Sequence, residues 1–390
     1  MPRIAIIGGG VAAHTLVTSL LAARTEDADL TIDIFSAEAH LPYRRPEVNK
    51  GILIEGKSPA EVALPGGIFY TPGVTLHLST TVTGMDLAAR TLSTGDATHH
   101  FDQLVFATGA GPRQLETDWS GGRDVHYIRT PEHAAALREK LSALGTDGTV
   151  VVIGGGVLGM EAAAAAATLS EAGVHVLELG DEVCARILPP TASRWLRDRH
   201  AEKNVTVTCG VSPDDLPGTV EALAPDVVIV SIGAVRDTHL AEDADLTVGD
   251  GDGGGIVVDE QGRTGVPGVF AVGDCVEIHS ADGSVLRPED DGSARALATL
   301  VASQLADRAV EAASFRDRPM KGWTKQFGHL LTTLGTTGVG AGLGEQVLLD
   351  TGEELVVFTV DGSTVVGVTT VGRSPEVRAA KKALGTVLAG

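Results

Sequence analysis

The chain has 390 residues, and 43% of them are hydrophobic. A chain of this length is too long to fold around one hydrophobic core, so we predict two or three domains. Its formal net charge of −21 argues against nucleic acids and anionic membranes as partners. We expect a cytoplasmic protein with no membrane attachment, because no apolar stretch approaches the roughly 20 residues that cross a bilayer and no signal-peptide pattern precedes the first strand.

The first predicted elements are a strand, a glycine-rich turn and a helix. The apolar strand Ile4–Ile7 leads into Gly8-Gly-Gly10 and then into an alanine- and leucine-rich helix that contains Ala13. Such a turn presents backbone N–H groups and the positive end of a helix to a pyrophosphate. An acid that binds a ribose hydroxyl is expected after the next strand, and we assign this role to Glu38, although it comes two residues late.

The segment that follows contains the sequence LPYRRPEVNK, residues 41–50. Its two prolines exclude a regular helix and predict an ordered loop. Short alternating strands are then predicted between Val74 and Leu92. A buried strand follows and ends in the small-residue turn Ala107-Thr108-Gly109, with Arg113 shortly after it.

A second strand, turn and helix repeats the first in register. The strand Val150–Ile153 runs into a G-x-G-x-x-G fingerprint formed by Gly154, Gly156 and Gly159. A single such fingerprint is a weak signal, but two copies in matching contexts indicate two dinucleotide-binding folds. Glu178 ends the next strand at the expected spacing for the ribose acid.

The remaining elements complete both folds and add a third region. Strands and helices alternate between Arg129 and Gly210, a buried strand ends at Gly233, and another ends at Gly273-Asp274. A long helix is predicted around Ala294–Ala313, then strands at 354–360 and 364–371, and a last helix from Pro375. From Phe315 onward the chain has eight Lys/Arg and seven Asp/Glu, so this region is nearly neutral, and we predict a domain boundary near Arg316–Met320.

The order of these motifs resembles that of the FAD-dependent pyridine nucleotide oxidoreductases. Within that superfamily, residues 41–50 resemble the LPYxRPPLSK sequence of ferredoxin reductases and rubredoxin reductases, and residues 287–300 are closer to the rubredoxin reductase version. Residues 323–326, WTKQ, are similar to the family's WSDQ. The resemblance implies an α/β fold with two Rossmann-like dinucleotide-binding domains, the NAD domain inserted into the FAD domain, and a small C-terminal α+β domain. The implied domains are 1–115 with 237–314 for FAD, 116–236 for NAD(H), and 315–390 as an interface domain.

The resemblance also assigns cofactor-binding residues for FAD and NADH. For FAD these are Gly8, Gly10, Ala13, Glu38, Arg45, Lys50, Val82, Ala107, Thr108, Gly109, Arg113, Gly273, Asp274 and Trp323. For the nicotinamide dinucleotide they are Gly154, Gly156, Gly159, Glu178 and Gly233. No arginine follows Glu178 to receive a 2′-phosphate, so NADH is expected to be preferred over NADPH. No metal site is predicted.

Lys50, Glu161 and Trp323 are the candidate catalytic residues. The resemblance implies that Lys50 lies beside flavin N5, and that Glu161, on the first turn of the second fold's helix, lies within reach of it. The alternatives are a solvated loop lysine and an acid that favours the helix dipole. Trp323 has two interpretations, a gate beside the flavin or an anchor of the last domain in the core.

Three positions depart from the family pattern. Arg236-Asp237 replaces the usual Pro-Asn, Asn49 replaces a serine before the loop lysine, and Lys325 replaces the aspartate of WSDQ. These positions bear on nicotinamide positioning and on the choice of electron acceptor.

The resemblance implies an NADH-dependent FAD reductase that passes electrons to a small iron–sulfur carrier, a ferredoxin or rubredoxin. The three separated cysteines support this reading over a disulfide reductase, which needs a dithiol beside the flavin. We expect the carrier to dock near the C-terminal domain, where the chain has Arg373, Arg378, Lys381 and Lys382. Two alternatives stay open: a flavoprotein acting directly on oxygen, a quinone or a metabolite, and a redox-sensing protein resembling apoptosis-inducing factor. The oligomeric state is also open.

Overall fold

The computed structural model describes residues 2–23, 30–115, 123–251, 253–306, 321–338 and 342–388. Contacts group the chain into two compact units. The first unit comprises Met1–Glu47, Lys57–Gly111 and Ala234–Asp317, and the second comprises Val48–Gly56, Pro112–Gly233 and Arg318–Gly390.

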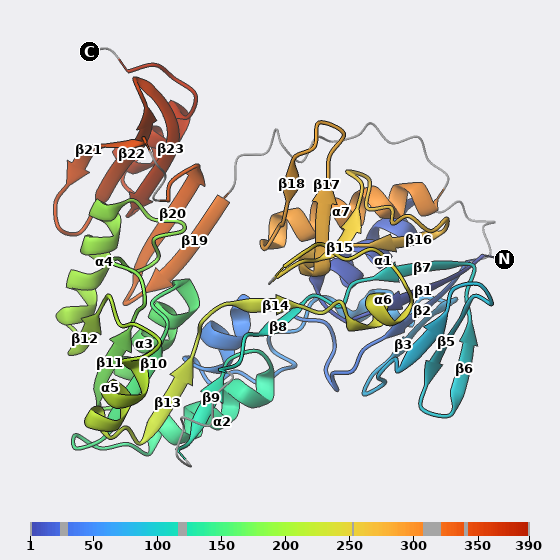
Figure 1. Ribbon diagram of the computed structural model, residues 1–390, viewed down its shortest axis with the longest axis horizontal. Helices are drawn as coiled ribbons and strands as arrows, with labels where there is room; N and C mark the ends of the chain where they lie inside the picture. The colour runs from blue at the N-terminus through green and yellow to red at the C-terminus, as the bar shows by residue number, and fades with distance from the viewer. Residues whose placement is uncertain are drawn as a thin grey trace. The chain divides into compact units, whose positions relative to one another are not determined.

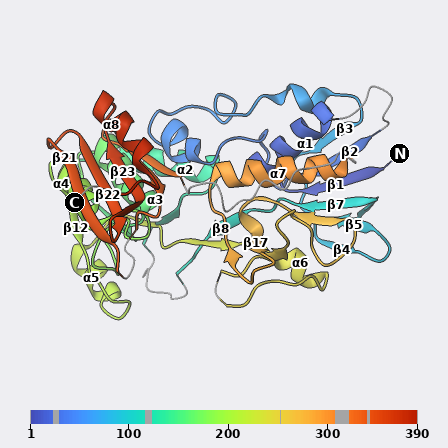
Figure 2. The ribbon, with the colours of Figure 1, turned by 90° about the horizontal axis from the view of Figure 1, so that it is seen from above.

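The first unit is built on a five-stranded parallel sheet. In order across the sheet, its strands are β16 (Val269–Ala271), β7 (Gln103–Phe106), β1 (Arg3–Ile7), β2 (Thr31–Phe35) and β3 (Val74–His77). Helices α1 (Val11–Ala23) and α7 (Asp291–Leu305) pack side by side (Figure 2). Strand β1 is apolar and buried after Arg3, as a strand covered on both faces requires, whereas β2 alternates the half-buried Thr31 and Asp33 with buried apolar residues.

Smaller elements complete the first unit. Two three-stranded sheets are formed by β4 (Gly84–Asp86), β5 (Thr91–Thr94) and β6 (Ala97–His100), and by β15 (Ile256–Val258), β17 (Val276–His279) and β18 (Val285–Leu286). Strands β8 (Ala110–Pro112) and β14 (Ala234–Arg236) pair with each other. The short helices are η2 (Gly66–Tyr70), η3 (Gly273–Cys275) and α6 (His239–Asp243).

The second unit contains another five-stranded parallel sheet (Figure 1). Its strands, in order, are β12 (Val205–Thr208), β11 (Gly173–Leu177), β10 (Thr149–Ile153), β13 (Val227–Val230) and β9 (Val125–Tyr127). The helices are α2 (Pro131–Ser142), α3 (Val157–Leu169), α4 (Pro190–Ala201) and α5 (Leu216–Leu223). Pro131 opens α2 directly after Thr130, whose hydroxyl caps the helix by accepting from the His133 N–H.

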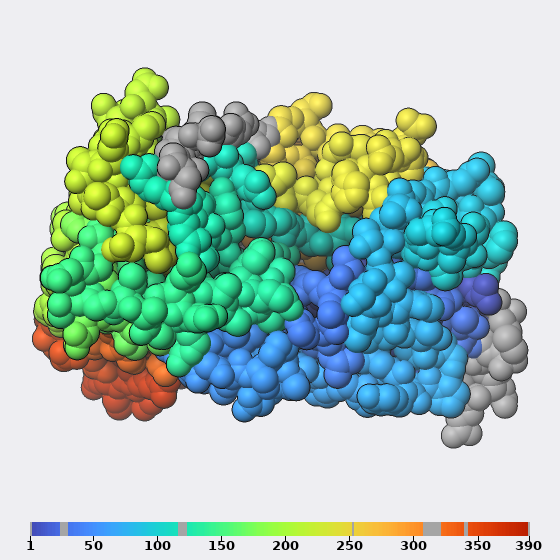
Figure 3. Space-filling view, turned by 90° about the horizontal axis from the view of Figure 1, so that it is seen from below, coloured from blue at the N-terminus to red at the C-terminus, as the bar shows by residue number. Residues whose placement is uncertain are grey.

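An antiparallel sheet near the C-terminus belongs to the same unit. Its strands, in order, are β19 (Lys321–Gln326), β20 (His329–Gly335), β23 (Thr364–Val371), β22 (Leu355–Asp361) and β21 (Gly344–Asp350). They are followed by α8 (Pro375–Ala380) and η5 (Lys381–Ala383). This sheet, red in Figure 3, lies against the green residues of the second nucleotide fold, where α3 contacts β19 and α4 contacts β22.

The predicted fold class is confirmed, with corrections to single elements. Residues 41–50 are not wholly a loop, because the π-helix η1 (Val48–Ile52) begins inside them. Leu53 N–H donates to the Val48 carbonyl at 2.9 Å, the five-residue spacing of a π-helix. Pro46 does not prevent this helix, because it precedes it and a proline at a helix start leaves no intrahelical hydrogen bond unmade.

Two further predictions concern boundaries. Helix α7 ends at Leu305, earlier than the predicted Ala313, and residues 307–313 lie outside the described residues, as does the predicted boundary at Arg316–Met320. The three predicted domain ranges stay a prediction. Within the described ranges no helix is long and apolar enough to span a membrane, and the cytoplasmic location also stays a prediction.

Candidate functional site

The first glycine turn joins β1 to α1 and has the shape that a phosphate cradle needs. A Cβ at Gly8 would come within 2.1 Å of the Ala107 carbonyl oxygen, so only glycine lets these two segments approach. A Cβ at Gly10 would meet nothing within 4 Å, so the space at the start of α1 is open. Ala13 is buried in the helix. The turn therefore fits a dinucleotide pyrophosphate against backbone amides.

Other predicted residues gather at the carboxyl ends of neighbouring strands in the first unit. Thr108 donates its hydroxyl to the Asp237 carbonyl at 2.6 Å, and Asp237 N–H donates to the Gly109 carbonyl at 3.0 Å. Gly273 lies against Ala12 at the start of α1, so the adjacent Asp274 lies near the open glycine turn. Val82 packs its side chain into the core of this unit. The carboxyl edge of a parallel sheet is where such folds bind ligands.

Glu38 and Arg45, both predicted to bind FAD, contact each other. The Arg45 guanidinium forms an ion pair with the Glu38 carboxylate, and Tyr43 donates its hydroxyl to Glu38 at 2.5 Å. Ser36, directly after β2, lies where the ribose acid of a standard fingerprint would be, because a Cβ at Gly9 would meet the Ser36 Oγ at 2.5 Å. The structure thus explains why the acid comes late: the fingerprint position holds a serine.

The second glycine turn joins β10 to α3 and is packed more tightly. A Cβ at Gly159 would lie 1.9 Å from the Gly154 carbonyl oxygen, whereas one at Gly156 would meet nothing within 4 Å. The Glu178 carboxylate accepts a hydrogen bond from the Gly155 N–H and another from the Gly180 N–H at 2.7 Å. Glu178 therefore orders the turn itself, and the turn leaves open space for a pyrophosphate at the start of α3.

Gly233 and Arg113 are brought together in the second unit. Arg113 N–H donates to the Gly233 carbonyl at 3.0 Å. Arg113 is predicted to contact FAD, and Gly233 is predicted to contact the nicotinamide dinucleotide. Both residues lie in connections between strands. The pairing places the Arg113 backbone beside the strand-ending glycine.

Lys50, Glu161 and Trp323 form one cluster, although they are far apart in the sequence. Lys50 Nζ lies 3.0 Å from Glu161 Oε1 and 3.9 Å from the centre of the Trp323 ring. The Lys50 and Glu161 side chains are only 19% and 7% exposed, which excludes a freely solvated lysine. Trp323 is 39% exposed, too open for an anchor in the core. A half-buried ammonium between a carboxylate and an indole face is held both by the opposite charge and by the ring electrons.

The predicted position of Glu161 in its helix needs correction. Helix α3 begins at Val157 and has no acid in its first turn, so Glu161 opens the second turn. A carboxylate there is a turn away from the free N–H groups, and it is buried against other side chains. Its role is therefore to meet the Lys50 ammonium, which the dipole alternative does not explain.

Four polar residues around this cluster were not among the predicted site residues. Asn49 and Thr324 both hydrogen-bond to Glu161, and Gln326 donates to Thr324 at 3.0 Å. Arg138 on α2 donates to the Leu53 and Ile54 carbonyls, both at 2.7 Å, and so holds the end of η1. The signal that could have found Thr324 and Gln326 is strand alternation, since two polar residues share the face opposite the exposed Trp323.

Of the other two departures from the family pattern, Lys325 is exposed on β19 and Arg236 has a structural role in the first unit. Its buried guanidinium donates to the Gly253 carbonyl at 2.8 Å and to Glu289 at 3.1 Å. A proline could make neither contact. The adjacent Asp237 holds the Thr108-Gly109 turn through its backbone, which an asparagine would do equally well.

The three cysteines are free and separate. Burial raises the pKa of the Cys184 thiol to about 12, with a further contribution from the Glu161 and Glu178 charges. Burial also raises the pKa of Cys209 and of Cys275. A thiol with a raised pKa is a poor nucleophile, so the chain offers no activated dithiol.

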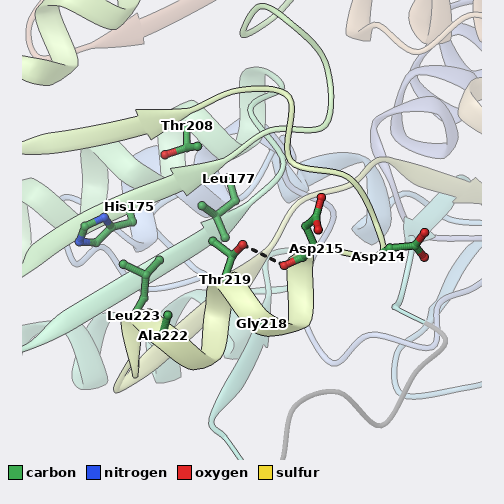
Figure 4. Close-up of a pocket in the computed structure, with 9 residues that line it drawn as sticks. All are labelled: His175, Leu177, Thr208, Asp214, Asp215, Gly218, Thr219, Ala222 and Leu223. Atoms are coloured by element: carbon green, nitrogen blue, oxygen red, sulfur yellow. Dashed lines mark hydrogen bonds between the residues drawn. The ribbon is translucent and has the colours of Figure 1, made fainter.

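One open cavity of about 700 Å³ lies in the second unit between β11, β12 and α5 (Figure 4). His175 lies at one end of it and Asp214 at the other, and no predicted site residue lines it. Among the described residues, no group of three or more His, Cys, Asp or Glu side chains is arranged to hold a metal ion.

Comparison with known proteins identifies a family and relatives with sequences similar to this chain. Residues 2–313 match the family model described as pyridine nucleotide-disulphide oxidoreductase. The chain is 30% identical over 318 residues to the rubredoxin-NAD(+) reductase of Pseudomonas putida, covering 78% of this chain and 80% of that protein. It is 33% identical over 283 residues to the ferredoxin–NAD(+) reductase component of the p-cumate 2,3-dioxygenase system of the same species, covering 70% and 67% of the two chains.

A solved structure agrees with these relatives. The ferredoxin reductase for the CYP199A2 system from Rhodopseudomonas palustris superposes with a TM-score of 0.84 at 27% identity, covering 99% of this chain and 96% of that one. The predicted superfamily is thereby confirmed. The chain belongs to the pyridine nucleotide-disulphide oxidoreductase family.

Proposed function

We propose that the protein is an NADH-dependent FAD reductase that delivers electrons to a small iron–sulfur protein of the ferredoxin or rubredoxin type. Family membership and the names of its relatives support an oxidoreductase that uses a pyridine nucleotide. The three buried or half-buried unpaired cysteines favour flavin-to-protein electron transfer over disulfide reduction.

The observation that carries the proposal is the cluster of Lys50, Glu161 and Trp323. When bound, FAD supplies the two-electron chemistry of hydride acceptance from NADH and the one-electron chemistry of release. The chain's own contribution is a fixed positive charge: Glu161 orients the Lys50 ammonium and Trp323 covers it. A cation held in a poorly hydrated site stabilises developing negative charge better than one in water, because no solvent must reorganise.

The second glycine turn favours NADH over NADPH. The Glu178 carboxylate lies at the end of β11, followed by Leu179 and Gly180, neither of which has a charge that could pair with a phosphate. A 2′-phosphate on the ribose would approach the Glu178 charge, and two anions repel each other. Under this proposal NADH binds more tightly than NADPH.

A basic surface near the C-terminus is the proposed docking site for the carrier. It consists of Arg373, Arg378, Lys381 and Lys382, with Lys321 close enough to Lys381 to contribute to lowering its pKa, although burial is the larger cause. Arg378 donates to the Arg373 carbonyl at 2.7 Å, which joins two of these residues. In a chain with a net charge of −21, such a cluster is the part suited to an acidic partner.

The activity is tested by anaerobic stopped-flow reduction of the purified protein with NADH, followed at the flavin absorbance band. A ferredoxin, a rubredoxin, oxygen or a quinone is then added in turn. Fast reduction with fast reoxidation only by a protein carrier is expected. Reoxidation by oxygen or a quinone alone would favour the direct oxidase, and a long-lived reduced flavin would favour the redox sensor. A protein that binds no flavin would overturn the proposal.

The role of Lys50 is tested by Lys50→Ala. Flavin reduction by NADH is expected to slow by at least about tenfold, the effect of losing one charged stabilising group of about 1.4 kcal/mol, while the bound FAD keeps its spectrum. An unchanged rate would remove Lys50 from the catalytic residues.

The docking surface is tested by the double charge reversal Lys381→Glu with Lys382→Glu. The KM for ferredoxin or rubredoxin is expected to rise about tenfold at low salt, and the salt dependence to weaken, with NADH reduction of the flavin unchanged. Lys203→Glu, an exposed change elsewhere in the same unit, is the matched control. Equal effects of both changes would show that net charge alone matters.

A further inference from the structure

The Glu161 carboxylate is surrounded by polar side chains from two other stretches of chain. Asn49 and Lys50 reach it from η1, and Thr324 reaches it from β19. Asn49, Glu161 and Thr324 are each less than 7% exposed, so water cannot satisfy these groups. A buried carboxylate is tolerated only when its lone pairs find hydrogen-bond donors.

The donors are divided between the two carboxylate oxygens. Glu161 Oε1 accepts from the Thr324 hydroxyl at 2.5 Å and lies 3.0 Å from Lys50 Nζ. Glu161 Oε2 accepts from the Asn49 side-chain amide. Without Asn49 the second oxygen would lose this buried partner, and without Thr324 the carboxylate could rotate away from the ammonium.

Gln326 fixes the direction of the Thr324 hydroxyl. A threonine hydroxyl has one hydrogen, and here that hydrogen is given to Glu161. The Thr324 oxygen can then act toward Gln326 only as an acceptor. It accepts a hydrogen bond from the Gln326 side-chain nitrogen at 3.0 Å. The hydrogen bonds therefore run in one direction, from Gln326 to Thr324 to Glu161.

We propose that Asn49 and Thr324 are positioning residues that act through Glu161 to aim Lys50. By occupying both oxygens of the carboxylate, they leave one orientation in which Oε1 faces the ammonium. This inference rests on the proposed function, in which Lys50 serves the flavin. Asn49 stands where the sequence pattern of the resembling family has serine, so this half of the arrangement departs from that pattern.

The test compares Thr324→Val, which keeps the shape and removes the hydroxyl, with Thr324→Ser, which keeps the hydroxyl. The limiting rate of flavin reduction at saturating NADH is expected to fall about tenfold in T324V, with flavin content and the Kd for NADH unchanged. T324S is expected to stay within about twofold of the unaltered protein. Equal rates in T324V, T324S and the unaltered protein would overturn the proposal.

A double-mutant cycle tests whether Thr324 acts through Glu161. In a Glu161→Gln background, T324V is expected to have less than a twofold further effect, because the carboxylate that Thr324 positions is gone. A full tenfold loss in that background would show that Thr324 acts by another route and would overturn the proposal.

A crystal structure of T324V provides a readout that does not depend on activity. The separation of Lys50 Nζ and Glu161 Oε1 is expected to exceed 4 Å, and an unchanged ion pair would overturn the proposal. Should T324V fail to fold, Asn49→Ser gives the same measurements at the other oxygen: a several-fold slower reduction and a displaced carboxylate are expected, and no change in either would overturn the proposal.

The failure of the proposed function is distinguishable from the failure of this inference. If the unaltered protein is not reduced by NADH, the proposed function is wrong, and the crystal structures of T324V and N49S still decide whether these residues aim Lys50. If the unaltered protein is reduced rapidly but both variants match it in rate and geometry, the inference alone is wrong.

Discussion

The two glycine turns of this chain follow the same sequence pattern but differ in how closely the helix packs against the turn and in which side chain contacts it. In the second turn, a Cβ at Gly159 would collide with the Gly154 carbonyl, whereas the first turn accommodates Ala13 at the equivalent position. In the second turn Glu178 contacts the Gly155 amide directly, whereas the first turn has Ser36 at that place and uses Glu38 further along. A shared fingerprint thus predicts the turn but not its tightness or the origin of its acid.

Cys184 packs against the second turn, and the low reactivity of its thiol gives the largest expected effect. Cys184 N–H donates to the Gly155 carbonyl at 2.9 Å, and burial raises the pKa of its thiol to about 12. Compared with an ordinary thiol, its thiolate fraction at pH 8 is about a thousandfold smaller. We expect alkylation by iodoacetamide, followed by mass spectrometry, to modify the half-buried Cys209 first. Modification of Cys184 at the rate of Cys209 would contradict the tight packing of this turn.

A methyl group at the third position of the glycine fingerprint is expected to have different effects in the two turns. Gly159→Ala is expected to push α3 away from Gly154, to lower the free energy of unfolding by about 1–3 kcal/mol and to weaken NADH binding by up to about a hundredfold. Urea unfolding and NADH titration measure both effects. The reverse change in the first turn, Ala13→Gly, should cost only about 1 kcal/mol. Equal costs for the two changes would show that the turns are packed alike.

The acid of the second turn is tested by Glu178→Gln. The Gly155 and Gly180 N–H groups donate to different oxygens of Glu178. Glutamine has the same size, but its amide nitrogen cannot accept a hydrogen bond, so one of these two contacts is lost. The apparent Kd for NADH is therefore expected to rise about tenfold. The preference against NADPH should also shrink, because the repelling charge is gone. Ser36→Ala, at the matching place in the first turn, is expected to leave NADH binding unchanged.

The smallest expected effect concerns the late acid of the first turn. Tyr43→Phe removes the hydroxyl that donates to Glu38 and should weaken FAD retention by about fivefold, the equivalent of about 1 kcal/mol. The release of FAD fluorescence on dilution measures this directly. A loss of NADH affinity instead would mean that Glu38 does not serve the first nucleotide.

Much of the fold could be predicted because its signals are local. The apolar strands, the glycine turns and the helices after them each occupy fewer than 20 consecutive residues, and the spacing of side chains reports their periodicity. The π-helix at Val48–Ile52 was missed because the two prolines in residues 41–50 favoured a loop and because a π-helix has no strong sequence signature. The roles of the predicted site residues stay predictions, although the structure brings several of them together.

By itself, the sequence determined that this chain has two folds of the dinucleotide-binding type and where their glycine turns lie, because these properties depend on neighbours along the chain. Only the tertiary structure decided that Asn49, Lys50, Glu161 and Thr324 meet, because contacts across more than 100 residues depend on how helices and strands pack. The burial of that carboxylate, and hence its need for several donors at once, is a property of the packed protein that no single segment contains.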